Sequence, residues 1–293
     1  MKKYAVYTAC IGNYDDICQP EVVDSRFDYI LFTDDTYEAP LGVWQVRHVD
    51  YCNLDKTRIA RYVKTHPHEL LPDYEATLWM DSSIQIISSY IYERVVELVK
   101  SQTELSAIKH PKRDCIYDEA FEVASRKSPG ALEYEDVAMT WCHKLWEEHY
   151  PLHNGLFETG ILYRRNDAVM EQFDNLWWTC IDNYSKRDQL SFNYVVWNCK
   201  PTYEHIFPVG EHAFNSPQVR FVGHANASAR KALHLNFSQR IRYRYRVLYR
   251  ERAFKQWCWT MKKRKPNMWL HTCGTITAIC YVSVYKLKKL ISK

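Results

Sequence analysis

The chain alternates short apolar runs with longer segments in which apolar residues recur every three or four positions. The short runs predict buried strands, and the longer segments predict amphipathic helices. The expected strands occupy residues 4–9, 29–33, 43–49, 76–80, 105–108 and 160–163. The expected helices occupy residues 54–71, 90–100, most of 116–150 with a break at 128–130, 168–184 and 188–197.

Alternation of this kind is typical of an α/β fold, in which a Rossmann-like, mostly parallel central sheet is flanked by helices. We expect this fold in residues 1–237. A chain of 293 residues with 46% hydrophobic residues can bury the core that such a fold requires. Ligands of such sheets bind beyond the carboxyl ends of the strands. The loops that follow the predicted strands are therefore the expected place of a functional site.

The ten cysteines are scattered and include no C-x-x-C pair, so neither a zinc site nor a disulfide framework is indicated. Residues 1–9 lack the apolar stretch of a signal peptide and run directly into the first predicted strand. These two features predict a cytoplasmic protein with free thiols.

Charge divides the chain into an acidic body and a basic tail. Residues 240–293 contain 15 Lys and Arg but one acid, whereas the remaining residues contain 24 Lys and Arg and 34 Asp and Glu. We therefore expect residues 238–293 to form a separate basic, helical tail.

The tail also carries aromatic residues, because Arg alternates with Tyr and Ile in residues 240–246 and Trp257 and Trp259 follow. Basic clusters are attracted to anionic lipid and tryptophan favours the headgroup region, which predicts peripheral attachment to the inner face of the cell membrane. The apolar run at residues 272–285 is too short to predict a spanning helix. The alternative is a solvated pair of basic helices that packs on the acidic body.

Acidic residues occur in three of the loops that follow predicted strands: residues 10–15, Asp34 with Asp35, and Asp81. In a parallel sheet these loops converge along one edge. Asp81 lies between two apolar runs, so we expect its carboxylate at the rim of the buried sheet, where it could hold Mg²⁺ or Mn²⁺ against a diphosphate. The alternative is that Asp81 only caps the turn after its strand.

Two predicted helices carry further polar groups. Arg58, Arg61 and Lys64 recur every three residues, so they share a face that could neutralise a nucleotide diphosphate or could simply be solvated. Asp188 and Gln189 begin a later helix, where they could bind sugar hydroxyls or only cap the helix.

Together these segments resemble a glycosyltransferase-like family, formerly a domain of unknown function, that occurs in plant mucilage and turgor-regulation proteins and in bacterial surface-polysaccharide loci. The resemblance rests on residues 7–15, 32–34, 61–64, 78–81, 110–115, 157–163 and 187–194. The order is also similar to the GT-A nucleotide-sugar fold, in which Asp-x-Asp, Asn-x-Gly and Asp-Gln-x-x-x-Asn segments follow one another. Those places are taken here by Asp81 to Ser83, by Glu158 to Gly160, and by Asp188, Gln189 and Asn193.

The resemblance implies a transferase that moves a sugar from a nucleoside-diphosphate sugar to a glycan or lipid-linked acceptor in surface polysaccharide biosynthesis. The nucleotide would be contacted by Thr8, Cys10, Gly12, Asn13 and Asp34. The diphosphate would be held by Asp81 and Ser83 through Mn²⁺ or Mg²⁺, with its charge offset by Arg58, Arg61 and Lys64. The donor sugar and the acceptor would be faced by Glu158, Asp188 and Gln189, and either of the two acids is a candidate base for an inverting reaction.

The sequence departs from this pattern at Ser83, which replaces the second metal-binding aspartate. Enzymes of the GT-A fold often add a late histidine ligand, for which the candidates are His212, His224 and His234. A catalytically inactive scaffold at the membrane is one alternative function, which Ser83 makes conceivable.

Two further alternatives concern nucleotides. A nucleic-acid-binding role could use the aromatic and basic residues of the tail, but the acidic body and the absence of a recognisable module argue against a nucleic-acid partner. A nucleotidyltransferase is disfavoured because the loop at residues 10–15 has one glycine and no basic residue.

Overall fold

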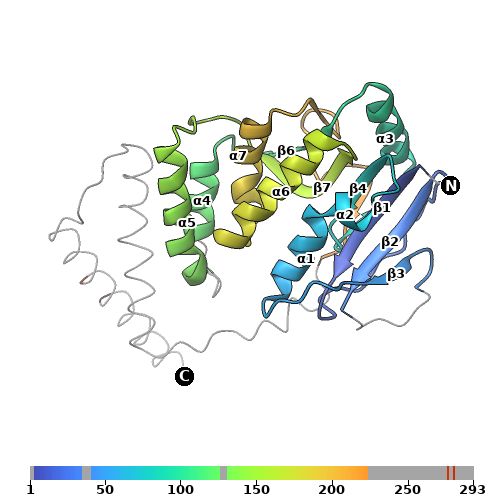
Figure 1. Ribbon diagram of the computed structural model, residues 1–293, viewed down its shortest axis with the longest axis horizontal. Helices are drawn as coiled ribbons and strands as arrows, with labels where there is room; N and C mark the ends of the chain where they lie inside the picture. Colours follow the sequence, from blue (N-terminus) through green and yellow to red (C-terminus); the bar gives the residue numbers. More distant parts are fainter. Residues whose placement is uncertain (1–2, 35–40, 126–130, 224–275, 277–279, 281–293) are drawn as a thin grey trace. The chain divides into compact units, whose positions relative to one another are not determined.

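The computed structural model describes residues 3–34, 41–125 and 131–223, together with residues 276 and 280 (Figure 1). The chain falls into two compact units. The first unit runs to Ile116 and resumes at His153, and it contains the central sheet. The second unit includes Tyr117–Leu152. The predicted tail and its boundary between residues 237 and 238 lie outside the described residues, apart from the isolated positions 276 and 280.

Seven strands form the central sheet, in the order β3-β2-β1-β4-β7-β6-β8. β7 is antiparallel to its neighbours β4 and β6, and all other neighbouring strands pair in parallel. The predicted α/β fold with a mostly parallel sheet is therefore confirmed. The strands are β1 (Tyr4–Cys10), β2 (Phe27–Thr33), β3 (Gln45–His48), β4 (Ala76–Met80), β6 (Leu105–Lys109), β7 (Phe157–Arg165) and β8 (Tyr203–His205).

The topology brings the polar loops to one edge of the sheet. β1 pairs in parallel with β2 on one side and with β4 on the other, so the carboxyl ends of these three strands lie at the same edge. Gly12, Asp34 and Asp81 lie in the segments that follow them. Beyond Asp81 the chain forms β5 (Ile84–Ile86), which pairs with β9 (Val219–Phe221) in a small antiparallel sheet.

Helices cover both faces of the central sheet. On one face the ring of Tyr92 packs against Phe27 and Tyr29, with centroids 5.0 and 6.3 Å apart. On the other face the hydroxyl of Tyr7 donates a hydrogen bond to the carbonyl oxygen of Lys64 at 3.0 Å. The first face is covered by α3 (Tyr90–Lys100), and the second by α1 (Lys56–Thr65), α6 (Ala168–Asn183) and α7 (Gln189–Cys199).

The segment predicted as one helix over residues 54–71 forms two helices. α1 ends at Thr65, and α2 (Pro67–Leu70) begins at Pro67. Proline has no N–H with which to continue the helical ladder, and its ring disfavours helical backbone at the preceding residue, His66, which has φ −125° and ψ 40°. At the other end of α1, the carboxylate of Asp55 accepts a hydrogen bond from the N–H of Thr57 at 3.0 Å. These two signals fix the length of the helix that carries Lys64.

In its described part the second unit is helical, as the sequence predicts, and it contains α4 (Ile116–Ser125) beyond its first residue and α5 (Ala131–Glu147). Ala138, Trp141, Cys142 and Leu145 are buried at helical spacing on α5. The predicted break at residues 128–130 lies outside the described residues. Within the described ranges, no helix has both the length and the apolar character needed to cross a bilayer.

Candidate active site

Asp34 links the loop after β1 to α1. Its Oδ1 accepts a hydrogen bond from the backbone N–H of Gly12 at 2.9 Å, and its Oδ2 accepts one from Lys56 Nζ at 3.0 Å. Gly12 has φ +70°, where glycine is favoured, and a Cβ atom there would lie 2.5 Å from Lys56 Cδ. The Lys56 side chain is 60% exposed, so this contact leaves a cation at the surface beside the expected nucleotide loop.

The remaining residues expected to contact the nucleotide differ in burial. Thr8 is buried, and its hydroxyl has no hydrogen-bond partner within the described part of the chain. Thr8 also lines a cavity of about 10 Å³ next to Asp81, which has room for about one water molecule. The Cys10 thiol is buried and donates to the carbonyl oxygen of Asp15 at 3.3 Å, whereas Asn13 is exposed. Of these residues, Cys10 has a structural role in closing the loop.

Asp81 follows β4 directly and lies at the rim of the sheet, as predicted. Its Oδ1 accepts a hydrogen bond from the indole N–H of Trp79 at 2.8 Å. Its backbone N–H donates to the carbonyl oxygen of Gly160 at 2.8 Å, which ties it to β7. A Cβ atom at Gly160 would lie 3.4 Å from Asp81 Oδ2 and 3.1 Å from Ile84 Cδ1. Glycine at position 160 therefore allows β7 to approach the carboxylate closely.

Lys64 lies between Asp81 and Asp188 and joins β4 to the start of α7. Its Nζ is 2.5 Å from Asp188 Oδ2 and 3.5 Å from Asp81 Oδ1, and its side chain has no exposed surface. Thr159 donates a second hydrogen bond to Asp188 Oδ2 at 3.0 Å, and Arg61 lies 3.4 Å from Asp188 Oδ1. Four segments that are far apart in the sequence thus meet around one buried lysine.

A second set of buried polar groups holds the end of α1 in place. The carbonyl oxygen of Lys64 accepts hydrogen bonds from Tyr7 at 3.0 Å and from Arg164 at 2.6 Å. Arg164 also pairs with Asp174 of α6 at 2.5 Å, and both side chains are buried. Because an unpaired buried charge is costly, this network fixes α1 against β1, β7 and α6.

The charges of the cluster shift one another's proton affinity. Burial lowers the pKa of the Lys64 ammonium, and the nearby carboxylates of Asp188 and Asp81 oppose this shift. Burial alone would raise the pKa of Asp188, but the positive charges of Arg61 and Lys64 outweigh burial and hold that pKa well below its usual range. Asp188 is therefore an ionised carboxylate whose proton affinity is low, and such a group is a weak general base.

The donor set beside Asp81 does not fit a divalent metal ion. One oxygen of Asp81 already accepts from Trp79 and faces Lys64, and Ser83 offers a hydroxyl where a second carboxylate would be needed. Within the described ranges, Asp81 belongs to no group of three or more His, Cys, Asp or Glu side chains close enough to share an ion. The expected Mn²⁺ or Mg²⁺ stays a prediction.

Of two other residues expected in the site, Gln189 lies next to the cluster around Lys64 and Arg58 does not. Arg58 turns away from Lys64 and donates to the carbonyl oxygens of Ile181 and Asp182 at the end of α6. Gln189 is buried next to Asp188; its Oε1 accepts from Arg187 at 3.3 Å, and its Nε2 has no partner among the described residues.

Glu158 and three late histidines are the remaining residues that the sequence predicts for the site. Glu158 is half-buried on β7, beside a β-bulge in the pairing with β6. His212 lies in a turn, where its N–H donates to Asn215 and its Nδ1 accepts from Phe214. His224 and His234 lie outside the described residues. The late histidine ligand stays a prediction.

Three residues contribute to the site although the sequence analysis expected no role for them. Lys56 pairs with Asp34, Thr159 donates to Asp188, and Arg164 donates to the carbonyl oxygen of Lys64. Lys56 follows the capping Asp55 and so could have been recognised at the start of α1. The contacts of Thr159 and Arg164 depend on the antiparallel placement of β7, which local sequence does not reveal.

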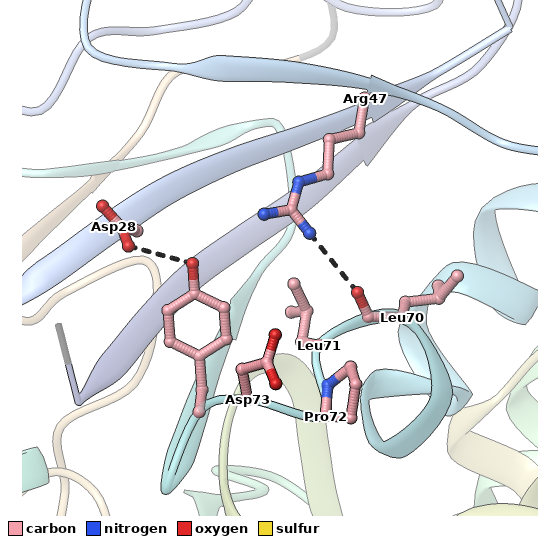
Figure 2. A pocket seen from close by; sticks show the side chains of 7 residues that line it. Asp28, Arg47, Leu70, Leu71, Pro72 and Asp73 are labelled. Atoms are coloured by element: carbon pink, nitrogen blue, oxygen red, sulfur yellow. Dashed lines mark hydrogen bonds between the residues drawn. The ribbon is translucent and has the colours of Figure 1, made fainter. Parts of the chain in front are cut away.

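A separate hollow of about 210 Å³ lies among β2, β3 and the segment between α2 and β4 (Figure 2). Arg47 donates to the carbonyl oxygen of Leu70 at 3.4 Å, and Tyr74 donates to Asp28 at 2.9 Å. Asp28 lies near the amino end of β2, whereas the candidate site lies at the carboxyl ends of the strands. The two places are therefore distinct.

Known proteins similar to this chain carry glycosyltransferase and ceramidase names. It is 21% identical over 220 residues to a probable hexosyltransferase, MUCI70, of Arabidopsis thaliana, covering 65% of this chain and 36% of the relative. It is 25% identical over 133 residues to the alkaline ceramidase TOD1 of Arabidopsis thaliana, covering 44% of this chain and 29% of the relative. The chain thus spans about a third of the length of these relatives.

A solved structure of WbbM, a bifunctional glycosyltransferase, aligns with 69% of this chain and 38% of its own, at 12% identity and a TM-score of 0.39. The model of the TOD1/MUCI70 glycosyltransferase-like domain family matches residues 1–216, which include the whole of the candidate site. This chain therefore belongs to the TOD1/MUCI70 glycosyltransferase-like domain family.

Proposed function

We propose that this protein is a glycosyltransferase that moves a sugar from a nucleoside-diphosphate sugar to a hydroxyl group of a glycan or lipid-linked acceptor, in the biosynthesis of a surface polysaccharide. The observation that carries the proposal is the cluster of Asp81, Lys64, Asp188 and Arg61 at the carboxyl edge of the sheet. Ligands of α/β sheets bind at this edge. Family membership and the hexosyltransferase name of one relative support the same reaction class.

The nucleotide is proposed to bind over the loop after β1. Gly12, Asp34 and Lys56 form a connected set there, and the exposed side chain of Lys56 supplies a positive charge. In sugar transfer negative charge develops on the departing diphosphate, so fixed cations near it lower the barrier. Arg61 is proposed to provide the second such cation, because it lies beside Asp188 and is partly exposed.

Asp81 and Gln189 are proposed to bind hydroxyl groups of the donor sugar. The Asp81 side chain is 36% exposed, and the Nε2 of Gln189 has no partner within the described part of the chain. The low pKa of Asp188 favours a positioning role for it, in which it holds Lys64 and Arg61. Glu158 is then the candidate base if the reaction inverts the anomeric centre.

A thermal-shift screen of the full-length chain tests the donor class. It uses UDP-, GDP-, CDP- and dTDP-sugars with wild type and Asp81→Asn, because a ligand that binds only the folded state raises the melting temperature. Stabilisation by one nucleotide class that is lost in the variant supports the proposal. Stabilisation by none, in a well-folded protein, contradicts it and favours the inactive scaffold.

We further propose that the basic tail attaches the enzyme to the inner face of the cell membrane. The support is its composition, with 15 Lys and Arg against one acid in residues 240–293. Co-sedimentation with vesicles that contain anionic lipid is expected, with binding that weakens as salt rises. Equal binding to neutral vesicles, or binding to oligonucleotides in preference to vesicles, would contradict this part of the proposal.

A further inference from the structure

Lys64 places a fully buried positive charge at the base of the candidate site. Its Nζ contacts Asp188 at 2.5 Å and lies 3.5 Å from Asp81. The ring centroids of Trp79 and Trp177 lie 5.3 and 5.8 Å from Nζ, within the range of a cation–π interaction. Two carboxylates and two indole rings thus surround one ammonium group.

The carboxylate oxygens that face this ammonium already accept other hydrogen bonds. Thr159 donates to Asp188 Oδ2, and Arg61 lies beside Asp188 Oδ1. The Oδ1 atom of Asp81 accepts from the indole of Trp79. A divalent ion that bound these oxygens would have to displace the donors and would then lie next to a like charge.

The ammonium is also held in place through its backbone. Tyr7 and Arg164 donate to the carbonyl oxygen of Lys64, and Arg164 is itself paired with the buried Asp174. Moving Lys64 away from Asp81 would disturb this network and leave Asp188 buried with fewer partners. The position of the ammonium is therefore built into the packing of α1.

We infer that this site binds its nucleotide donor without a divalent metal ion, because the Lys64 ammonium lies between Asp81 and Asp188 and already supplies the positive charge there. The inference rests on the proposed function, since it concerns the same donor site. Ser83 agrees with it, because a hydroxyl replaces the second carboxylate of the metal-binding pattern. Lys56 and Arg61, with side chains 60% and 22% exposed, are the cations left to contact the diphosphate directly.

Nucleotide affinity with and without metal tests the inference on the full-length chain. Isothermal titration calorimetry with UDP, GDP, CDP and dTDP is carried out in excess EDTA and again in Mn²⁺. We expect the nucleotide that binds to have the same affinity in both, within about threefold. A loss of about tenfold or more in EDTA that Mn²⁺ restores overturns the inference and leaves the proposed function standing. If no nucleotide binds in either condition, both are overturned.

Direct titration with Mn²⁺, followed by electron paramagnetic resonance, gives a second readout that needs no nucleotide. We expect the wild-type protein to have no Mn²⁺ site that depends on Asp81, so Asp81→Asn should not reduce Mn²⁺ binding. Such a site, including one completed by His224 or His234, overturns the inference. This measurement needs no substitution of Lys64, so it can be made even if a variant at that position fails to fold.

Replacing the lysine is expected to create the metal site that wild type lacks. Lys64→Gln leaves Asp81 and Asp188 close together without their shared cation, so this variant is expected to gain Mn²⁺ binding. Arg94→Gln is the matched control, because it also removes a largely buried cation paired with a carboxylate, that of Glu204, and it is expected to gain none. A folded Lys64→Gln protein that binds no more Mn²⁺ than Arg94→Gln counts against the inference.

Discussion

At the scale of single residues, the site depends on charges that are stable only together. Lys64 and Asp188 are both buried, and each would be costly without the other. Asp81 differs, because part of its side chain reaches the surface and can meet a ligand. One carboxylate of the cluster is therefore accessible, and the other is buried against Lys64.

The first prediction concerns the buried pair. Lys64→Met is expected to lower the free energy of unfolding by about 3–5 kcal/mol, because it leaves the Asp188 carboxylate without its closest partner. Lys64→Met combined with Asp188→Asn should recover much of this loss, since the unpaired charge is gone. Urea unfolding of the two single variants and the double variant measures the coupling. Additive losses would mean that the pair does not act as a unit.

The second prediction concerns the close approach of β7 to Asp81. Gly160→Ala places a Cβ atom 3.1 Å from Ile84 Cδ1, which must give way by a few tenths of an ångström, and 3.4 Å from Asp81 Oδ2, which it brings into van der Waals contact. We expect nucleotide-sugar affinity to fall by about tenfold or more while the unfolding free energy drops by about 1–3 kcal/mol. Calorimetry and urea unfolding check the two effects. Unchanged affinity in a variant that is destabilised as expected would count against a donor contact by Asp81.

At the scale of elements, the loop after β1 and the two ends of α1 position the site. The positive φ of Gly12 turns the loop so that its N–H meets Asp34, and α1 then brings Lys56 to the same carboxylate. Pro67 ends the helix soon after Lys64. Both features are visible in the sequence, but their meeting at one edge depends on strand order.

Gly12→Ala tests the conformation of this loop. The substitution is expected to cost about 1–2 kcal/mol of stability, because a residue with a Cβ atom is strained at φ +70°. It should also weaken nucleotide binding, since the new methyl group would displace Lys56 from Asp34. The control is Lys56→Ala, which removes the cation without straining the loop. If both variants bind nucleotide like wild type, the loop lies outside the donor site.

The junction between α1 and α2 predicts a dependence of stability on pH. Burial lowers the pKa of His66, whose ring stacks on Tyr62 with centroids 3.9 Å apart. The unfolded chain therefore binds a proton below about pH 6.5 that the folded state resists, so the stability that His66 contributes is present above this pH and lost as pH falls.

His66→Asn is expected to flatten the decline in unfolding free energy between neutral and mildly acidic pH. His205→Gln, at a less buried histidine whose pKa burial also lowers, should flatten it less. Urea unfolding at a series of pH values measures both slopes. A His66→Asn protein with the slope of wild type would rule out this titration.

At the scale of the whole molecule, local pattern predicted most of the architecture. The runs at Tyr4–Cys10 and Ala76–Met80 are short, apolar and followed by polar loops, which is sufficient to predict parallel strands and a site at their ends. The sequence predicts β7 as a strand. Its antiparallel direction follows from long-range pairing with β4 and β6, so it cannot be predicted from local sequence.

In the site, too, local sequence predicted which residues are present but not their long-range contacts. The three-residue spacing predicted that Arg58, Arg61 and Lys64 share one face toward a diphosphate. In the structure Arg61 and Lys64 pair with Asp188, while Arg58 bonds to the end of α6, because a spacing of three drifts around the helix. The burial of Lys64 was also invisible in the sequence, because it arises from the packing of α6 and α7 over α1. The sequence thus identified Lys64, Asp81 and Asp188 as candidates, and tertiary packing determined which of them pair.

Turnover of a nucleotide-sugar tests the proposed active site. Release of nucleoside diphosphate is followed for the full-length chain, with water or glycan as acceptor, in wild type, Asp81→Asn and Arg61→Gln, with Arg94→Gln as control. We predict turnover by wild type and the control, and a loss of about a hundredfold or more in the two site variants without loss of folding. No release from any nucleotide-sugar, or undiminished release by both site variants, would contradict the proposed active site.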